Sequence, residues 1–444
     1  MDFKDKKILV CGLGLSGIAA AKKLLELGAA VTVSDLKARD RIPNISEISE
    51  ALMCLEKNPD AIVPEQDIII VSPGIPGDVP FIEAARTLGI PVWSEIELAY
   101  RMCPCPVIAI TGTNGKTTTT SLVGEILQLH NPETVIAGNI GIPFVGVLDR
   151  LTANSVAVVE TSSFQLESVS CFRPKIAALL NITPDHLNRH KTFENYSFVK
   201  HRIFENQKPD DFAVLNADDD NNPATVRGKP VYFSRRSRLD EGVYVEDGHI
   251  TYRWNGVYER LLHTEDLIIP GAHNIENALA ATAIALCANV PPGIIRQGLL
   301  RFRGVEHRTE LVGEINGVEF YNDSKATNPE AAIKAIEAMS RQIVLIGGGY
   351  DKDADFSDWV RAFDGRVKHL IVIGEVTNKI IDCCKAYNYD NFDRANSLRS
   401  SVELAYAKAI PGDCVLLSPA CASYDMFDGF EQRGNMFKQF VKEL

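Results

Sequence analysis

The chain has 444 residues, 45% hydrophobic and 23% charged, a balance typical of a globular protein with about three domains at roughly 150 residues each. A net charge of −12 without a basic run argues against nucleic-acid binding, which needs clustered lysines and arginines. No apolar run approaches about 18 residues and the N-terminus lacks a signal-peptide pattern, so we expect a cytoplasmic protein without a membrane span.

The first segment alternates short apolar runs with an amphipathic stretch. Strands are predicted at 6–14 and 29–35, with a helix at 16–28 between them, and another strand follows at 67–75. This alternation predicts a parallel, doubly wound α/β sheet. Prolines in the run 101–106 resist both helix and central strand, so we expect the segment to end there.

A glycine-rich turn follows the first predicted strand. It reads G-L-G-L-S-G at 12–17, and Asp35 lies near the end of the second strand. Together they satisfy the dinucleotide fingerprint and, taken alone, predict an NAD-dependent oxidoreductase. The motif is a weak signal, because its glycines only allow the backbone to approach a pyrophosphate, and UDP also contains one.

The most informative stretch is T-G-T-N-G-K-T-T at 111–118, which follows a strand beginning at Val107 and opens a helical pattern. Its glycines let backbone N–H groups converge on an anion, and the helix N-terminus adds partial positive charge. Lys116 can reach the outer phosphates of a nucleotide, and the Thr117 hydroxyl can ligate Mg²⁺. Ile110 stands where the usual loop has its first glycine, so this is a variant phosphate loop, with a plain polar turn as the alternative.

The middle segment continues with more apolar strands. They are predicted at 155–163, 175–183 and 212–219, and a helix is predicted from about 274 to 288. Glu160 lies at the end of the first strand, where a carboxylate beside a phosphate loop is well placed to hold Mg²⁺.

Ordinary interpretations exist for each polar side chain of this segment. Glu160 could be an exposed strand-end carboxylate, His186 a structural or exposed histidine, and Lys200 a solvated lysine on a helix. Asn277 could simply lie near a helix start, with Asn274 as its cap.

The third segment follows a linker at 302–308. Its strands are predicted at 318–323, 342–349, 369–375 and 414–420, and the segment ends in a helix near 428–443, which indicates another α/β unit.

Several motifs along nearly the whole chain resemble the Mur ligase family. They are T-G-T-N-G-K-T-T at 111–118, E-T-S-S-F-Q-L at 160–166, N-x-x-x-D-H at 181–186, H-N-x-x-N-x-L-A-A at 273–281, D-S-K-A-T-N at 323–328 and S-P-A-x-A-S-x-D-x-F at 418–427. The segment at 160–166 resembles in particular the members that add D-glutamate.

The resemblance implies an α/β fold with three domains. We expect a Rossmann-like UDP-substrate-binding domain at 1–96, a central P-loop ATPase-like domain with a mainly parallel sheet at 97–303, and a Rossmann-like amino-acid-binding domain at 304–444. The implied reaction uses ATP to phosphorylate the carboxylate of UDP-N-acetylmuramoyl-L-alanine, and the amine of D-glutamate then attacks the acyl phosphate. The implied working state is a cytoplasmic monomer.

The resemblance also assigns residues around the nucleotide. The catalytic residues would be Lys116, His186, Lys200 and Arg308. ATP would be held by Gly112, Thr113, Asn114, Gly115, Lys116, Thr117, Thr118, Asn277, Arg308 and Asp323. Two Mg²⁺ ions would be held by Thr117, Glu160, His186 and Lys200, the lysine carrying a carbamate derived from CO₂. The carbamate makes physical sense, because an ammonium would be repelled by the cations that an anionic carbamate can ligate.

The remaining implied residues bind the other two substrates. The UDP-linked substrate would be contacted by Leu15, Ser16, Asp35, Ser72, Gly74 and Asn139, and D-glutamate by Lys325, Thr327, Lys352, Ser423 and Phe430. Cation–carboxylate hydrogen bonds are about twice as strong as neutral ones, which suits a dicarboxylate amino acid.

Alternative functions remain open at this point. Another Mur ligase or a folylpolyglutamate synthase-like enzyme would share the phosphate loop. An NAD-dependent oxidoreductase would use the turn at 12–17, and a nucleotide-binding switch would bind ATP without substrate-stimulated phosphate release.

Overall fold

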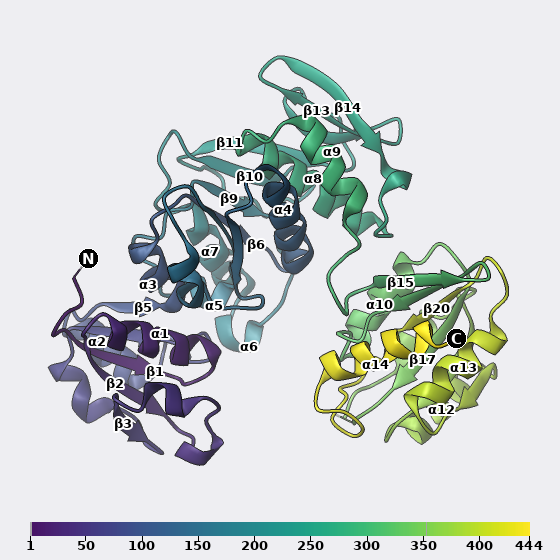
Figure 1. The fold of residues 1–444 in the computed structure, drawn as a ribbon, viewed down its shortest axis with the longest axis horizontal. Coiled ribbons are helices and arrows are strands. Elements are labelled where there is room, and N and C mark those ends of the chain that lie inside the picture. The colour runs from purple at the N-terminus through teal and green to yellow at the C-terminus, as the bar shows by residue number, and fades with distance from the viewer. Residues whose placement is uncertain (1, 352) are drawn as a thin grey trace. The chain divides into compact units, whose positions relative to one another are not determined.

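The computed structural model describes residues 2–351 and 353–444. These residues form two compact units (Figure 1). The first contains the chain up to Thr264 together with Glu276–Leu299, and the second contains Glu265–Ile275 and Leu300–Leu444. No helix within the described ranges is both long and apolar enough to cross a membrane.

The N-terminal sheet of the first unit has the order β3-β2-β1-β4-β5 and is parallel throughout. Its strands are β1 (Lys7–Cys11), β2 (Ala30–Asp35), β3 (Leu52–Leu55), β4 (Ile68–Val71) and β5 (Val92–Ser94), and its helices are α1 (Leu15–Glu26), α2 (Pro80–Thr87) and α3 (Glu95–Met102). This order is that of a Rossmann half with its neighbouring strands, as predicted. The apolar run of β1 is buried because helices cover both faces of a parallel sheet.

The central sheet has the order β14-β13-β12-β11-β10-β9-β6-β8-β7. Its strands are β6 (Val107–Thr111), β7 (Thr134–Gly138), β8 (Val156–Glu160), β9 (Ile176–Leu179), β10 (Phe212–Asn216), β11 (Lys229–Ser234), β12 (Gly242–Glu246), β13 (His249–Trp254) and β14 (Val257–His263). Its helices are α4 (Lys116–His130), α5 (Ser163–Leu166), α6 (Leu187–His190), α7 (Phe193–His201), α8 (Ala272–Cys287) and α9 (Pro292–Arg301).

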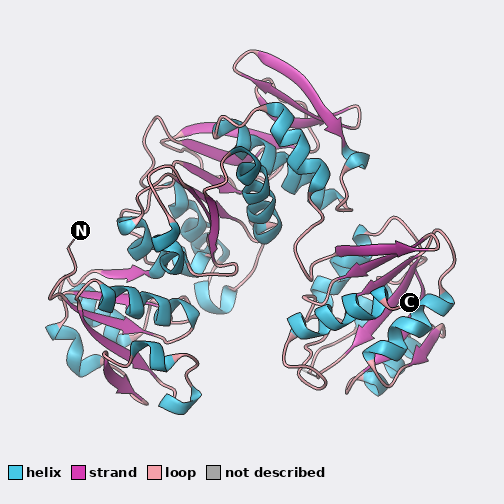
Figure 2. Ribbon diagram, viewed as in Figure 1, coloured by secondary structure: helices cyan, strands magenta, loops and turns pink. Residues whose placement is uncertain are grey.

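The mainly parallel character of this sheet is confirmed, with one addition. Strands β6 to β12 pair in parallel, whereas β12, β13 and β14 form an antiparallel meander that extends one edge (Figure 2). No sequence pattern predicted this meander. Strand β14 has four exposed residues, and β12 and β13 are partly buried, so these strands lack the continuous apolar runs that identified the buried parallel strands.

The sheet of the second unit has the order β15-β16-β20-β17-β18-β19. Its strands are β15 (Glu310–Ile315), β16 (Val318–Asn322), β17 (Ile343–Gly348), β18 (Val367–Ile373), β19 (Phe392–Arg394) and β20 (Cys414–Leu417). Its helices are α10 (Pro329–Ala338), α11 (Ser357–Arg361), α12 (Thr377–Ala386), α13 (Leu398–Lys408) and α14 (Phe430–Lys442). Only β15 is antiparallel to its neighbour, so the predicted Rossmann-like character holds.

Short 3-10 helices connect some of these elements. They span Arg39–Arg41, Ile45–Ile48, Asp60–Glu65, Phe144–Arg150, Arg202–Phe204 and Thr264–Asp266.

A buried carboxylate on α3 fixes the backbone that leads into β9. Glu97 is fully buried and accepts hydrogen bonds from the backbone N–H groups of Ser170, Cys171 and Phe172 at 2.9–3.0 Å. Arg101, one helical turn along, donates its Nε to the same carboxylate at 2.7 Å. The carboxylate thus satisfies donors that burial would otherwise leave without partners.

We expect Glu97→Ala to lower the free energy of unfolding by about 3–5 kcal/mol, because the backbone donors and the arginine lose their shared acceptor. Urea denaturation monitored by circular dichroism would measure the shift. Glu97→Gln retains an acceptor oxygen and should cost less. Equal transition midpoints for wild type and Glu97→Ala would contradict this role.

Candidate active site

The loop between β6 and α4 has the backbone of an anion-binding turn. Gly112 and Gly115 take φ values of +156° and +82°, which side chains other than glycine rarely adopt. Lys116 is the first residue of α4, and its Nζ donates to the carbonyls of Gly112 and Thr113 at 2.9 and 2.8 Å. The ammonium therefore lies over the loop, where it can meet an incoming phosphate. Thr117 and Thr118 follow in the first turn of α4 and are buried.

The turn after β9 holds this loop in place. The backbone N–H groups of Thr113 and Asn114 donate to the carbonyl and side-chain oxygens of Asn181 at 2.9 and 2.8 Å. The Thr113 hydroxyl lies 3.0 Å from the Tyr196 hydroxyl and accepts from the Thr183 N–H at 3.0 Å. Residues from β9 and α7 thus fix the loop, and Asn181 and Tyr196 received no individual role from sequence.

Glu160 lies at the end of β8, directly beside the end of β6. Its side chain is only 1% exposed, so the interpretation as an exposed strand-end carboxylate is wrong. Oε1 accepts from Asn139 Nδ2 at 2.8 Å. Oε2 is buried and has no hydrogen-bond partner among the described residues. A buried carboxylate oxygen without a donor is an expected position for a cation.

Lys200 is buried on α7, so the interpretation as a solvated helix lysine is also wrong. It is 1% exposed, and Nζ donates to the carbonyl of Gly112 at 2.8 Å. The Tyr196 ring centroid lies 4.8 Å from Nζ. Burial, together with the positive charge of Lys116, lowers the pKa of Lys200 from 10.5 to about 6.

His186 lies at the start of α6 with a left-handed backbone at φ +52°. Its side chain is 48% exposed, and Nε2 lies 3.5 Å from Asp185 Oδ2. The ring packs 4.8 Å from the Phe164 ring, measured between centroids. An accessible imidazole with one carboxylate neighbour can ligate a metal through a ring nitrogen.

Asn277 packs directly against the phosphate loop although it is distant in sequence. It is 5% exposed, its Oδ1 accepts from the Thr119 hydroxyl at 3.1 Å, and a Cβ on Gly115 would approach that oxygen to 2.4 Å. The alternative that Asn274 caps this helix is wrong, because α8 begins at Ala272 and the Asn274 side chain donates to the Pro270 carbonyl.

The glycine-rich turn after β1 is closed by its own neighbours. The Asp35 carboxylate accepts from the Leu13 N–H at 2.7 Å and from the Lys37 N–H at 2.9 Å. Ser72 donates its hydroxyl to the Gly12 carbonyl at 2.6 Å. Asp35 therefore shapes the turn through backbone hydrogen bonds.

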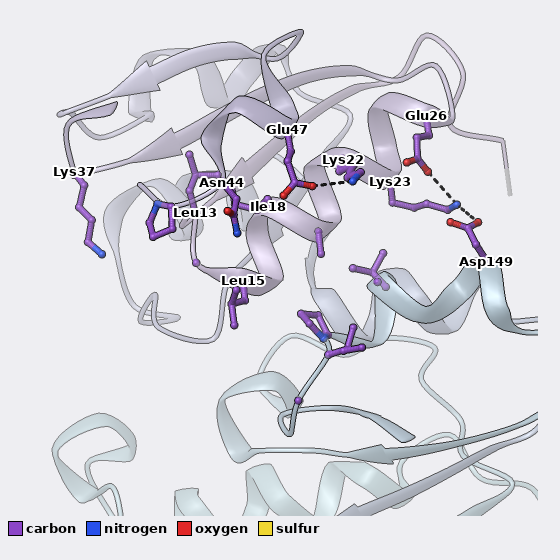
Figure 3. Close-up of a pocket in the computed structure, with 18 residues that line it drawn as sticks. Leu13, Leu15, Ile18, Lys22, Lys23, Glu26, Lys37, Asn44, Glu47 and Asp149 are labelled. Carbon is purple, nitrogen blue, oxygen red and sulfur yellow. Dashed lines mark hydrogen bonds and ion pairs between the residues drawn. The ribbon is translucent and has the colours of Figure 1, made fainter. Parts of the chain in front are cut away.

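A cavity of about 690 Å³ opens beside this turn (Figure 3). Leu15 lies at its edge and is 68% exposed. Lys22 pairs with Glu47, and Lys23 with Asp149, along its wall. Ser16 is half buried and Gly74 exposed near the same turn, but neither lines the cavity.

In the second unit, Asp323 is the first residue after β16. It is 4% exposed and accepts from the Thr309 N–H at 3.0 Å and the Ser418 hydroxyl at 2.7 Å. Burial raises the pKa of Asp323 to about 6. Both carboxylate oxygens therefore accept hydrogen bonds from groups of the second unit itself. Arg308, the neighbour of Thr309, is exposed.

The other residues predicted for this unit gather around one loop and α14. Lys325 Nζ lies 5.7 Å from the centroid of the Phe430 ring, at the start of α14. Thr327 is half buried and its N–H donates to the Lys325 carbonyl at 2.9 Å. Ser423 is buried. Lys352 lies outside the described residues.

The residue that joins these loops, Arg433, has no role that the sequence motifs indicated. Arg433 is 1% exposed and donates to the Ser324 hydroxyl at 2.9 Å, the Ser324 carbonyl at 2.8 Å and the Cys421 carbonyl at 3.1 Å. Burial lowers the pKa of Arg433 to about 10. The arginine fixes the loops that contain Lys325 and Ser423.

The residues around the phosphate loop fit a nucleotide and Mg²⁺. The two glycines leave the backbone open, and the lysine ammonium covers the loop. The buried Glu160 Oε2, which has no donor in the ranges 2–351 and 353–444, could supply the hard oxygen ligand that Mg²⁺ prefers.

Comparisons with known proteins find the same family along the whole length of the chain. Family models match at 6–94 (Mur ligase MurD-like, N-terminal domain), 110–285 (Mur ligase middle domain) and 307–421 (Mur ligase, glutamate ligase domain). The UDP-N-acetylmuramoylalanine–D-glutamate ligases of Alkaliphilus oremlandii and Thermoanaerobacter pseudethanolicus are each 48% identical, covering 100% of this chain and 100% of the relative.

Solved structures support the fold. The UDP-N-acetylmuramate–alanine ligase of Thermotoga maritima aligns with a TM-score of 0.60 at 19% identity, covering 99% of both chains. The UDP-N-acetylmuramoylalanyl-D-glutamyl-2,6-diaminopimelate–D-alanyl-D-alanyl ligase of Acinetobacter baumannii aligns with a TM-score of 0.56 at 16% identity, covering 94% of this chain and 86% of that one. With family models matching most of its length and relatives 48% identical from end to end, the chain belongs to the Mur ligase family.

Proposed function

We propose that this chain is an ATP-dependent ligase that adds D-glutamate to UDP-N-acetylmuramoyl-L-alanine in peptidoglycan precursor synthesis. The similarity at 48% identity to ligases of that name, over the full length of both chains, carries the proposal. The reaction would serve cell wall biogenesis, and with it cell shape and cell division. The proposal places the reaction in the cytoplasm. A monomer would suffice, because one chain supplies all the proposed site residues.

The proposed domain bounds are 1–96 for the UDP-linked substrate, 97–303 for ATP and 304–444 for the amino acid. Each range contains one sheet, and the family models at 6–94, 110–285 and 307–421 fall within these ranges.

The phosphate loop is the proposed site of carboxylate activation. Backbone N–H groups at Gly112, Thr113, Asn114 and Gly115, with Thr118, would cradle the phosphates of ATP. Lys116 would stabilise negative charge as the γ-phosphoryl group moves to the substrate carboxylate and forms an acyl phosphate. Asn277, packed on Gly115, would contact the nucleotide, and in the second unit Arg308 and Asp323 are proposed contacts to the phosphates and ribose of ATP.

The proposed metal ligands are Thr117, Glu160, His186 and a carbamate on Lys200. Bound Mg²⁺ would offset the charge of the phosphate oxygens. The buried Glu160 Oε2 supports this assignment, because it has no hydrogen-bond donor among the described residues.

The carbamate proposal rests on the surroundings of Lys200. Only a neutral amine attacks CO₂, and burial that lowers the pKa to about 6 leaves most of the amine neutral at pH 7. The product would be an anion built on Nζ, and Nζ lies 2.8 Å from the Gly112 carbonyl oxygen at the phosphate loop. A carbamate there could ligate a cation, which an ammonium would repel.

The two remaining substrates have their own proposed contacts. Leu15, Ser16, Asp35, Ser72, Gly74 and Asn139 are proposed for the UDP-linked substrate. Lys325, Thr327, Lys352, Ser423 and Phe430 are proposed for D-glutamate. The assignment of Asn139 is supported by its hydrogen bond to Glu160. A substrate bound by Asn139 would lie beside this proposed metal ligand.

Phosphate release with UDP-N-acetylmuramoyl-L-alanine and ATP tests the substrate assignment. D-Glutamate should stimulate release strongly, and L-glutamate, L-lysine and L-alanine should not. A matched reaction without the UDP-linked substrate gives the background. Stimulation by another amino acid, with none by D-glutamate, would show that the substrate is wrong.

Lys116→Ala should reduce kcat by about 10²–10³-fold or more, because the transferring phosphoryl group loses its cation. Steady-state phosphate release measures the loss. Lys208→Ala, which changes an exposed lysine in the same unit, should retain normal turnover. Normal kcat in Lys116→Ala would remove the proposed role of the loop.

Lys200→Ala should lose most turnover, and short carboxylates such as formate or acetate should restore part of it by taking the place of the carbamate. With ¹³C-bicarbonate, NMR should show a carbamate signal in the wild type that is absent from Lys200→Ala. Because the lysine has a pKa of about 6, the signal should fall as the pH drops below about 6 and the amine takes up a proton. Wild-type turnover in Lys200→Ala without added carboxylate would refute the proposal.

A further inference from the structure

One arginine joins the segment that contains His186 to a loop of the N-terminal sheet. Arg189 lies on α6, and its Nη2 donates to the backbone carbonyl of Ile75 at 2.6 Å. The same guanidinium forms a two-pronged pair with Glu167, with Nη2 to Oε2 at 2.6 Å and Nε to Oε1 at 3.2 Å. It also lies 5.0 Å from the centroid of the Phe164 ring. The contact joins residues 114 positions apart in the chain.

The loop at 72–78 also has hydrogen bonds to residues of the N-terminal sheet and its helices. Ser72 donates to the Gly12 carbonyl, and Arg86 donates to the Gly77 carbonyl at 2.8 Å. A Cβ on Gly77 would lie 3.6 Å from Glu167 Oε2, so the loop also lies against the carboxylate that orients Arg189. Arg189 therefore adds a hydrogen bond from the central sheet's α6 to a loop that is anchored to the glycine-rich turn.

The ion pair between Arg189 and Glu167 is largely shielded from solvent. The side chains of Arg189 and Glu167 are 14% and 16% exposed. Charge-assisted, two-pronged pairs have fixed geometry and are stronger than neutral hydrogen bonds. A second pair from the same stretch, Lys191 with Asp78 at 3.9 Å, is more than 60% exposed on both sides and should contribute little.

We propose that Arg189 is a positioning residue that fixes the loop at 72–78 relative to the segment containing His186. The UDP-linked substrate, bound at that loop, would then have its carboxylate directed toward the phosphate loop. This inference rests on the proposed function, because it assigns Ser72 and Gly74 to that substrate. Glu167 orients the guanidinium, and the Ile75 carbonyl receives its hydrogen bond.

The test compares Arg189→Ala, Arg189→Lys, Glu167→Gln and the control Lys191→Ala. Binding of UDP-N-acetylmuramoyl-L-alanine is measured by calorimetry, and KM for that substrate and for ATP by phosphate release. Arg189→Ala should weaken binding and raise KM for the UDP-linked substrate by about 10-fold or more, through loss of a charge-assisted hydrogen bond. KM for ATP should change less than twofold.

Arg189→Lys keeps one donor and should recover part of the binding, and Glu167→Gln should show a smaller defect than Arg189→Ala. Lys191→Ala should match the wild type. Unchanged binding in Arg189→Ala, or an equal rise in both KM values, would overturn the inference. If Arg189→Ala does not fold, Arg189→Lys and Glu167→Gln decide by the same ratio of KM values. Because binding is measured without turnover, failure of D-glutamate transfer alone would overturn the proposed function and leave this result standing.

Discussion

The backbone of the turn at Gly112–Gly115 packs closely against its neighbours, and this packing limits which residues the central sheet can place around the turn. Glycine is required at both positions because their φ values are positive and because a Cβ on Gly115 would approach Asn277 Oδ1 to 2.4 Å. The parallel strands β6, β8 and β9 bring Glu160 and the turn after β9 to the same sheet edge as this turn. The side chains that reach the phosphate loop come from this edge and from neighbouring helices, as Asn181 after β9 and Lys200 on α7 show.

Burial decides the chemistry of the polar groups at that edge. Lys200 and Glu160 are both about 1% exposed, yet Lys200 donates to a backbone carbonyl, whereas Glu160 Oε2 meets no donor within the described part of the chain. Burial favours the neutral form of the lysine and lowers its pKa. A carbamate and cations together would balance both groups, which links the two parts of the proposed metal site through one physical cause.

The second unit uses buried charge in a different way. The buried guanidinium of Arg433 donates to backbone carbonyls and a hydroxyl, so it fixes loop shape. Asp323 likewise accepts from the Thr309 N–H and the Ser418 hydroxyl. These hydrogen bonds hold the loops that the proposed amino-acid contacts share, independently of any ligand.

The sequence alone indicated many of the parallel strands, the phosphate-loop motif and the family, because apolar runs, glycines and local motifs need only neighbouring residues. It did not indicate the parallel strands β3, β5, β7, β11 and β19. It also indicated Glu160, His186 and Lys200 through resemblance, but not their surroundings. Only the tertiary structure decided that Lys200 is buried, that Asn277 packs on Gly115, and that the edge of the central sheet is an antiparallel meander. The physical reason is that burial and hydrogen bonding at these positions depend on residues far away in the chain, as much as 158 positions for Thr119 and Asn277. No local pattern encodes such contacts.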